Sequence, residues 1–101
     1  MAEFVKVATV PEIPKGTARV FQAGGTPVAL YNLDGAIHAT ANACPHRGGP
    51  LGEGAVADGI ITCPWHGFQF DVKSGRCLTN PGLSVPCLAV TIEGQDVLVK
   101  S

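Results

Sequence analysis

The sequence predicts an all-β fold, an antiparallel β-sandwich or barrel, on the basis of three observations. Turn-forming pairs such as Asp34-Gly35 and Asp58-Gly59 recur along the chain. The segments between the turns are short and rich in β-branched and aromatic residues, and no stretch has the pattern of a long helix. Thirteen glycines and eight prolines in 101 residues disfavour helix but stay below the level typical of disordered sequence.

Eight strands are expected in chain order, because each segment has strand-forming residues and most are bounded by a turn signal. In the first half of the chain they are residues 4–8, 18–21, 28–32 and 37–41, with Leu33-Asp34-Gly35 between the last two. In the second half they are residues 60–62, 68–72, 88–92 and 97–99. The turn signals of this half are Asp58-Gly59, Lys73-Ser74-Gly75, Asn80-Pro81-Gly82 and Glu93-Gly94.

Length and composition favour one domain that spans residues 1–101, since a chain of this size with 46% hydrophobic residues has room for one core. Glu3 and Lys6 interrupt the window in which an export signal needs an apolar segment. No apolar run approaches the roughly 18 to 20 residues of a membrane span. We therefore expect a cytoplasmic protein. A formal net charge of −1 argues against nucleic acid or an anionic membrane as the partner, which leaves another protein.

Two short segments, Cys44-Pro45-His46-Arg47-Gly48 and Cys63-Pro64-Trp65-His66-Gly67, each offer one thiolate and one imidazole before a glycine. Cys44, His46, Cys63 and His66 thus make a set of four metal ligands. Such a set suits either a tetrahedral zinc or a [2Fe-2S] cluster with cysteines on one iron and histidines on the other. Zinc fingers bring like ligands together in sequence, whereas cysteine and histidine alternate here, which favours the cluster. A zinc-stabilised interaction module without a redox role remains the alternative.

With these ligands, the two loops resemble those of the Rieske family, which read C-x-H and C-x-x-H. Pro45, Pro64, Gly48 and Gly67 strengthen the likeness, and the chain from about residue 31 to 81 resembles the small Rieske-type ferredoxins. The resemblance implies one [2Fe-2S] cluster per chain, held by Cys44, His46, Cys63 and His66. It also implies a cluster-binding subdomain of about residues 42–82, in which the turn at residues 80–82 covers the cluster.

The resemblance further implies an electron-transfer protein, the soluble ferredoxin component of a ring-hydroxylating dioxygenase system in aromatic hydrocarbon catabolism. Its donor would be a flavoprotein NAD(P)H reductase and its acceptor the terminal oxygenase. A Rieske oxygenase needs a mononuclear iron with two further histidines and a carboxylate, but only His38 is left of the three histidines. The chain also has no G-x-G-x-x-G fingerprint for a dinucleotide. We therefore expect a monomeric carrier without catalytic residues. The small Rieske-like subunit of an assimilatory nitrite reductase is the alternative.

Two pairs of positions differ from the respiratory Rieske proteins. Gly49 and Trp65 stand where those proteins have a disulfide between the loops, and Phe68 and Phe70 stand where they have serine and tyrosine hydroxyls. Donors near the cluster sulfurs stabilise the reduced state, so the resemblance implies a low-potential member.

The remaining expectations concern surface and core. The electron is expected to leave through a surface rimmed by Arg47, Pro50, Leu51, Trp65 and Pro81, although tryptophan is more often a core residue. Cys77 and Cys87 are expected to be free thiols packed in the core, because cysteine is among the most buried residue types and a cytoplasmic chain is kept reduced. His38 is expected to be a surface or half-buried residue without a ligand role.

Overall fold

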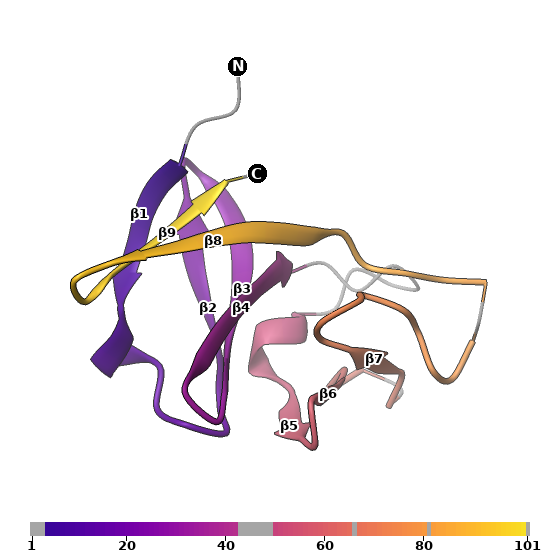
Figure 1. Ribbon diagram of the computed structural model, residues 1–101. Helices are drawn as coiled ribbons and strands as arrows, with labels where there is room; N and C mark the ends of the chain where they lie inside the picture. Colours follow the sequence, from indigo (N-terminus) through magenta and orange to yellow (C-terminus); the bar gives the residue numbers. More distant parts are fainter. Residues whose placement is uncertain (1–3, 43–49, 66, 81, 101) are drawn as a thin grey trace.

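The computed structural model describes residues 4–42, 50–65, 67–80 and 82–100, which form two antiparallel sheets (Figure 1). The six-stranded sheet has the order β1-β9-β8-β4-β3-β2, and the three-stranded sheet has the order β5-β6-β7. The strands are β1 (Phe4–Thr9), β2 (Ala18–Ala23), β3 (Thr26–Leu33), β4 (Ala36–Ala41), β5 (Ala55–Ala57), β6 (Ile60–Thr62), β7 (Gln69–Asp71), β8 (Cys87–Glu93) and β9 (Asp96–Lys100). Two 3-10 helices, η1 (Val10–Glu12) and η2 (Leu51–Glu53), complete the described elements.

The larger sheet curves towards a barrel, because its two end strands, β1 and β2, come into contact. Short hairpins join β2 to β3, β3 to β4 and β8 to β9 (Figure 1). The β3–β4 hairpin turns at Asp34-Gly35, where both residues have positive φ angles of 56° and 99°. Asp-Gly is a favoured pair for such a turn, because glycine takes this conformation without steric cost and aspartate tolerates it.

Strand β3 is buried on both faces and separates two hydrophobic clusters. Its side chains point alternately to opposite faces, as in any strand. Val28 and Leu30 belong to the cluster inside the barrel, and Ala29 and Tyr31 belong to the cluster between the barrel and the three-stranded sheet. This position explains why β3 reads as a nearly continuous apolar run rather than as an alternating one. The small sheet is therefore fastened to the barrel through a shared core.

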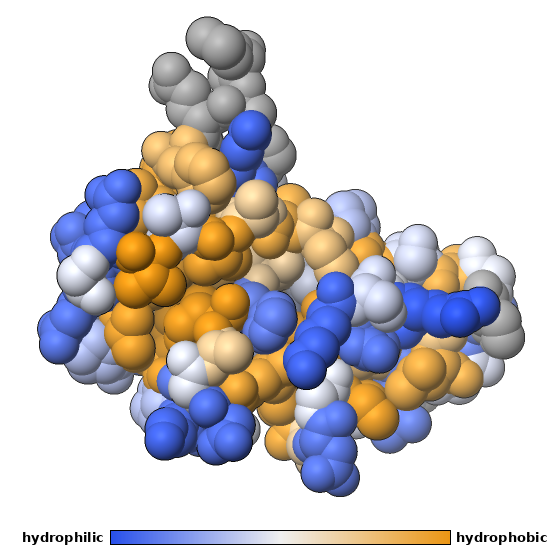
Figure 2. All heavy atoms as spheres, in the orientation of Figure 1, coloured by the Kyte–Doolittle hydropathy of each residue, from blue (hydrophilic) through white to orange (hydrophobic). Residues whose placement is uncertain are grey.

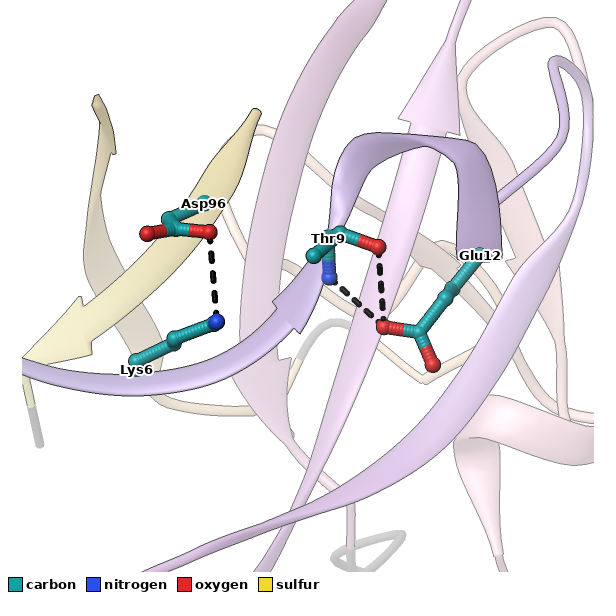
Figure 3. Close-up of polar contacts among 4 residues, drawn as sticks. All are labelled: Lys6, Thr9, Glu12 and Asp96. Atoms are coloured by element: carbon teal, nitrogen blue, oxygen red, sulfur yellow. Dashed lines mark hydrogen bonds and ion pairs between the residues drawn. The ribbon is translucent and has the colours of Figure 1, made fainter. Parts of the chain in front are cut away.

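Polar contacts connect β1 to β9 and to η1 (Figure 3). Lys6 Nζ on β1 lies 3.3 Å from Asp96 Oδ1 on β9, in an exposed ion pair. At the end of β1, the backbone N–H and the hydroxyl of Thr9 both donate to Glu12 Oε1, at 2.7 and 3.1 Å. These two bonds satisfy polar groups where the strand gives way to η1. Exposed pairs of this kind contribute little stability on their own.

The prediction of an antiparallel β fold is confirmed, and all eight expected strands are present, with their ends shifted by two residues at most. Strand β5 and the two 3-10 helices, each of three residues, have no counterpart among the expected elements. On the face drawn in Figure 2, hydrophobic side chains gather over the barrel strands. Within the described part of the chain, no helix has the length and hydropathy to cross a membrane.

Candidate cluster-binding site

Of the four predicted ligands, Cys63 lies in the described part of the structure. Cys44, His46 and His66 lie outside the described residues, as do Arg47, Gly49 and Pro81 of the predicted surroundings. Among the described residues, no three histidine, cysteine or acidic side chains come together as a metal site. The structure therefore describes the candidate site through Cys63 and through the residues that flank the other predicted ligands.

Cys63 follows β6 directly and starts the second ligand loop. Its side chain is buried, with 1% of the residue exposed. Its backbone N–H donates to the carbonyl of Phe68 at 2.7 Å, which closes a tight loop before β7 begins. Gly67 in this loop has a φ of 72°, in the left-handed region that glycine adopts without strain. The sequence forms this loop because glycine stands where the chain must reverse.

The first ligand loop begins after β4 and ends at η2. The backbone carbonyl of Asn42, at the start of the loop, accepts the N–H of Leu51 at 2.8 Å, and Asn42 Oδ1 accepts the N–H of Gly52 at 2.8 Å. Leu51 is fully buried in the same hydrophobic cluster as Cys63. Each of the two ligand loops therefore has one end packed in the same hydrophobic core.

A third segment, residues 77–83, packs along β7, which follows the second loop. The backbone N–H of Leu78 donates to the carbonyl of Gln69 at 2.7 Å, and the backbone N–H of Gln69 donates to Thr79 Oγ1 at 3.1 Å. Within the segment, the backbone N–H of Asn80 donates to the buried sulfur of Cys77 at 3.2 Å, and the carbonyl of Asn80 accepts the N–H of Leu83 at 3.0 Å. These bonds hold the ends of the turn that the resemblance places over the cluster.

The exposed hydrophobic residues near the loops differ in part from the expected rim. Trp65 is 48% exposed, which is consistent with its expected place in the rim and not with the core position that tryptophan more often takes. Leu51 has no exposed surface and cannot be part of a docking rim, because η2 turns its side chain into the core. Leu78, also 48% exposed, belongs to the third segment and was missed. Its position after a buried cysteine in an irregular segment gave no periodic signal.

The two remaining cysteines are both free thiols, as expected, but only one is buried. Cys77 is 1% exposed and belongs to the core cluster. Cys87 is exposed at the start of β8, so the expectation that it packs in the core is wrong. Its thiol lies 3.7 Å from the carbonyl oxygens of Val72 and Lys73. Partial burial, and then the carboxylate of Asp71, raise the pKa of this thiol.

His38 is half-buried on β4, as expected for a residue without a ligand role. Partial burial lowers its pKa, and the positive charge of Lys73 lowers it further. Both effects favour the neutral imidazole at neutral pH.

The surroundings of Cys63 suit a cluster without net charge. The buried hydrophobic residues around Cys63 include Leu51, Ile61 and Phe70, and no acidic or basic side chain is buried in the part of the chain that the structure describes. A [2Fe-2S] centre with two thiolates and two neutral imidazoles is neutral when oxidised, so burial beside this apolar shell carries no charge penalty. The donor set and the shell therefore fit the group, and Cys44, His46, Cys63 and His66 are the residues that would hold it.

Comparison with known proteins gives a consistent result. The sequence matches the Rieske [2Fe-2S] domain over residues 3–95. It is 34% identical to the ferredoxin component of the naphthalene 1,2-dioxygenase system of Pseudomonas aeruginosa, over 96% of this chain and 94% of that protein. It is 35% identical to human apoptosis-inducing factor 3 over 94% of the chain, which spans 16% of that longer protein. The fold is similar to that of the ferredoxin of carbazole 1,9a-dioxygenase from Nocardioides aromaticivorans IC177, with a TM-score of 0.88, 28% identity and 95% of each chain covered.

Proposed function

Because the chain belongs to the Rieske [2Fe-2S] domain family, we propose that it is a one-electron carrier that passes electrons from a flavoprotein NAD(P)H reductase to an aromatic-ring-hydroxylating oxygenase. The observation that carries this proposal is the match to a dioxygenase ferredoxin component over almost the full length of both chains. The chain itself converts no substrate. A monomeric state and a cytoplasmic location belong to the same proposal.

The described residues support this role by holding ligand loops on a fixed base. When bound, the cluster supplies a centre that gains and loses one electron. Cys44 and Cys63 would hold one iron, and His46 and His66 the other. Leu51 and Cys63, at the bases of the two loops, are both buried in the same hydrophobic core. This core supports the proposal by fixing these two points relative to each other.

The exposed side of the site is suited to a protein partner. Trp65 lies beside the ligand position His66, and its half-exposed ring offers apolar surface for a partner. Large aromatic residues at the surface are typical anchors of protein interfaces. The partner at this surface would be first the reductase and then the oxygenase.

Anaerobic mixing of the reduced protein with a ring-hydroxylating oxygenase tests the proposal. The protein is reduced with one electron equivalent, mixed with the oxygenase component of a naphthalene dioxygenase system, and followed by its visible absorption. We expect reoxidation as the electron passes to the oxygenase. A Cys63→Ser variant, which lacks one ligand, is the matched control and should give no such signal. Reoxidation by a sirohaem nitrite reductase instead of the oxygenase would contradict the proposal and favour the alternative.

A further inference from the structure

Asn42 joins the two ends of the first ligand loop. It is the first residue after β4, and its backbone carbonyl accepts the N–H of Leu51. Its side-chain oxygen accepts the N–H of the next residue, Gly52, at 2.8 Å. One residue therefore accepts two successive backbone N–H groups from the opposite end of the loop. The side-chain bond lies in a partly buried region, where competition from water is reduced.

The far end of the loop cannot shift easily. Leu51 and Gly52 are both buried in η2. A Cβ atom at Gly52 would lie 2.7 Å from Val20 Cγ2 and 3.0 Å from the backbone carbon of Arg19, so η2 packs directly against β2. Because this end is fixed to the barrel, a bond between it and Asn42 restrains the other end.

The near end of the loop is anchored as well. The N–H of Ala41, the last residue of β4, donates to the carbonyl of Pro86 at 3.0 Å. Asn42 therefore leaves a strand that is fixed up to its last residue. Among the described residues, the hydrogen bonds recorded between the two ends of the loop are both accepted by Asn42. These two bonds therefore set the distance between the ends.

We propose that Asn42 is a positioning residue that fixes the span of the loop carrying Cys44 and His46, and thereby keeps iron in the site. This inference rests on the proposed function. Without the side-chain oxygen, the N–H of Gly52 has lost its partner, and the contact between Asn42 and η2 breaks more often. A hydrogen bond of ordinary net strength corresponds to a factor of about five in the ratio of broken to formed contact. We expect iron to leave from the state in which this contact is broken, so its release should be faster by about the same factor.

Iron release to a chelator measures this effect on the intact protein that carries its cluster. Asn42→Ala removes the acceptor, whereas Asn42→Asp keeps a carboxylate oxygen that can accept the same N–H. We expect release about five times faster in Asn42→Ala and close to the wild-type rate in Asn42→Asp. Wild-type release from Asn42→Ala would overturn the proposal.

Asn32→Ala is the matched control for a purely structural role. Asn32 is buried, its Nδ2 donates to the carbonyl of Ile13 and its Oδ1 accepts the N–H of Gly35, both at 2.7 Å and both away from the ligand loops. This variant should lower Tm without faster iron release well below Tm. If iron release in both variants simply follows the loss of Tm, Asn42 has no positioning role and the proposal fails.

Amide exchange of Gly52 gives a second measurement that does not need the cluster. Its exchange should be about fivefold faster in Asn42→Ala, and the amides of the barrel strands should be unaffected. Asn42→Ser, whose hydroxyl is too short to span the same gap, replaces the alanine variant if that one does not fold. Unchanged exchange of Gly52 contradicts the inference about Asn42. Absence of iron and sulfide from the wild-type protein contradicts the proposed function instead, and the exchange measurement then still decides on Asn42.

Discussion

Ionisation of Tyr31 is coupled to folding, because its phenol is buried. Its hydroxyl lies 2.7 Å from Thr40 Oγ1 in the core between the barrel and the small sheet. Burial raises the pKa of the phenol to about 12, although the bond to Thr40 acts in the opposite direction. The buried phenol therefore stays protonated at pH values at which an unfolded chain would ionise it.

Stability should accordingly fall in alkali through this residue. Between the ordinary pKa of 10.0 and the folded value of about 12, the unfolded state binds fewer protons than the folded state. The free energy of unfolding then decreases by up to about 1.4 kcal/mol per pH unit, and the contribution is complete only below pH 10. Urea unfolding of wild type and Tyr31→Phe from pH 9 to 12 measures it. The phenylalanine variant should lack this part of the slope, and identical slopes would refute the assignment.

At the scale of elements, the three-stranded sheet requires glycine at position 54, where there is no room for a side chain. Gly54 connects η2 to β5, and a Cβ there would lie 2.0 Å from the carbonyl oxygen of Thr62 on β6. The φ of Gly54 is −81°, which other residues adopt freely, so contact alone excludes a side chain. Since Cys63 follows Thr62, the same close approach fixes the start of the second ligand loop.

We predict that Gly54→Ala costs about 3 kcal/mol or more, because a backbone oxygen cannot move aside without opening the β5–β6 pair. Gly94→Ala is the comparison. Gly94 has a φ of 65° and open space around it, so alanine there should cost only about 1 kcal/mol through backbone strain. Denaturant unfolding of both variants gives the two values. A smaller loss in Gly54→Ala than in Gly94→Ala would show that the close approach has been misjudged.

Element by element, the sequence predicts the strands better than it predicts the hydrogen bonds that hold the loops. The strands before and after Asp34-Gly35 follow from strand-forming residues on either side of an obvious turn. The strand at Ala55–Ala57 was missed because three residues, two of them alanine, give no strand signal of their own.

The candidate site shows the same division. Its four ligands are a prediction from residue type and spacing, and the family match shows the Rieske [2Fe-2S] domain without naming the residues that bind the group. The roles of Asn42 and Thr79 could not be predicted in this way, because each side chain bonds to a backbone group that only the tertiary fold brings near. The exposure of Cys87 was misjudged for a related reason, since apolar neighbours in sequence do not decide which face of a strand is covered.

At the scale of the whole molecule, the barrel supports the three segments at which the proposed site would lie. The first described residue of β1 and the last of β9 lie at the far side of the barrel from the three-stranded sheet (Figure 1). The core between the barrel and the small sheet holds Cys63, Leu51 and Cys77, one residue from each segment. A single apolar core thus holds three separate parts of the chain in register.

The phenylalanines at positions 68 and 70 predict a low midpoint potential for the [2Fe-2S] centre. Phe70 is fully buried, and neither Phe70 nor Phe68 has a hydroxyl that can donate to a cluster sulfur. Without such donors the extra negative charge of the reduced state is less stabilised. We expect a value in the lower part of the range of about −150 to +300 mV known for Rieske centres. A redox titration measures it, and a midpoint above about +100 mV would contradict the argument from the two phenylalanines.

Low-temperature electron paramagnetic resonance of the dithionite-reduced protein tests the central claim most directly. Mixed ligation by Cys44, Cys63, His46 and His66 should give a spectrum with a lower average g value than a cluster with four cysteine ligands. That result is the one expected for a Rieske electron carrier. A silent sample that contains one zinc per chain would contradict the cluster and, with it, the proposed electron transfer.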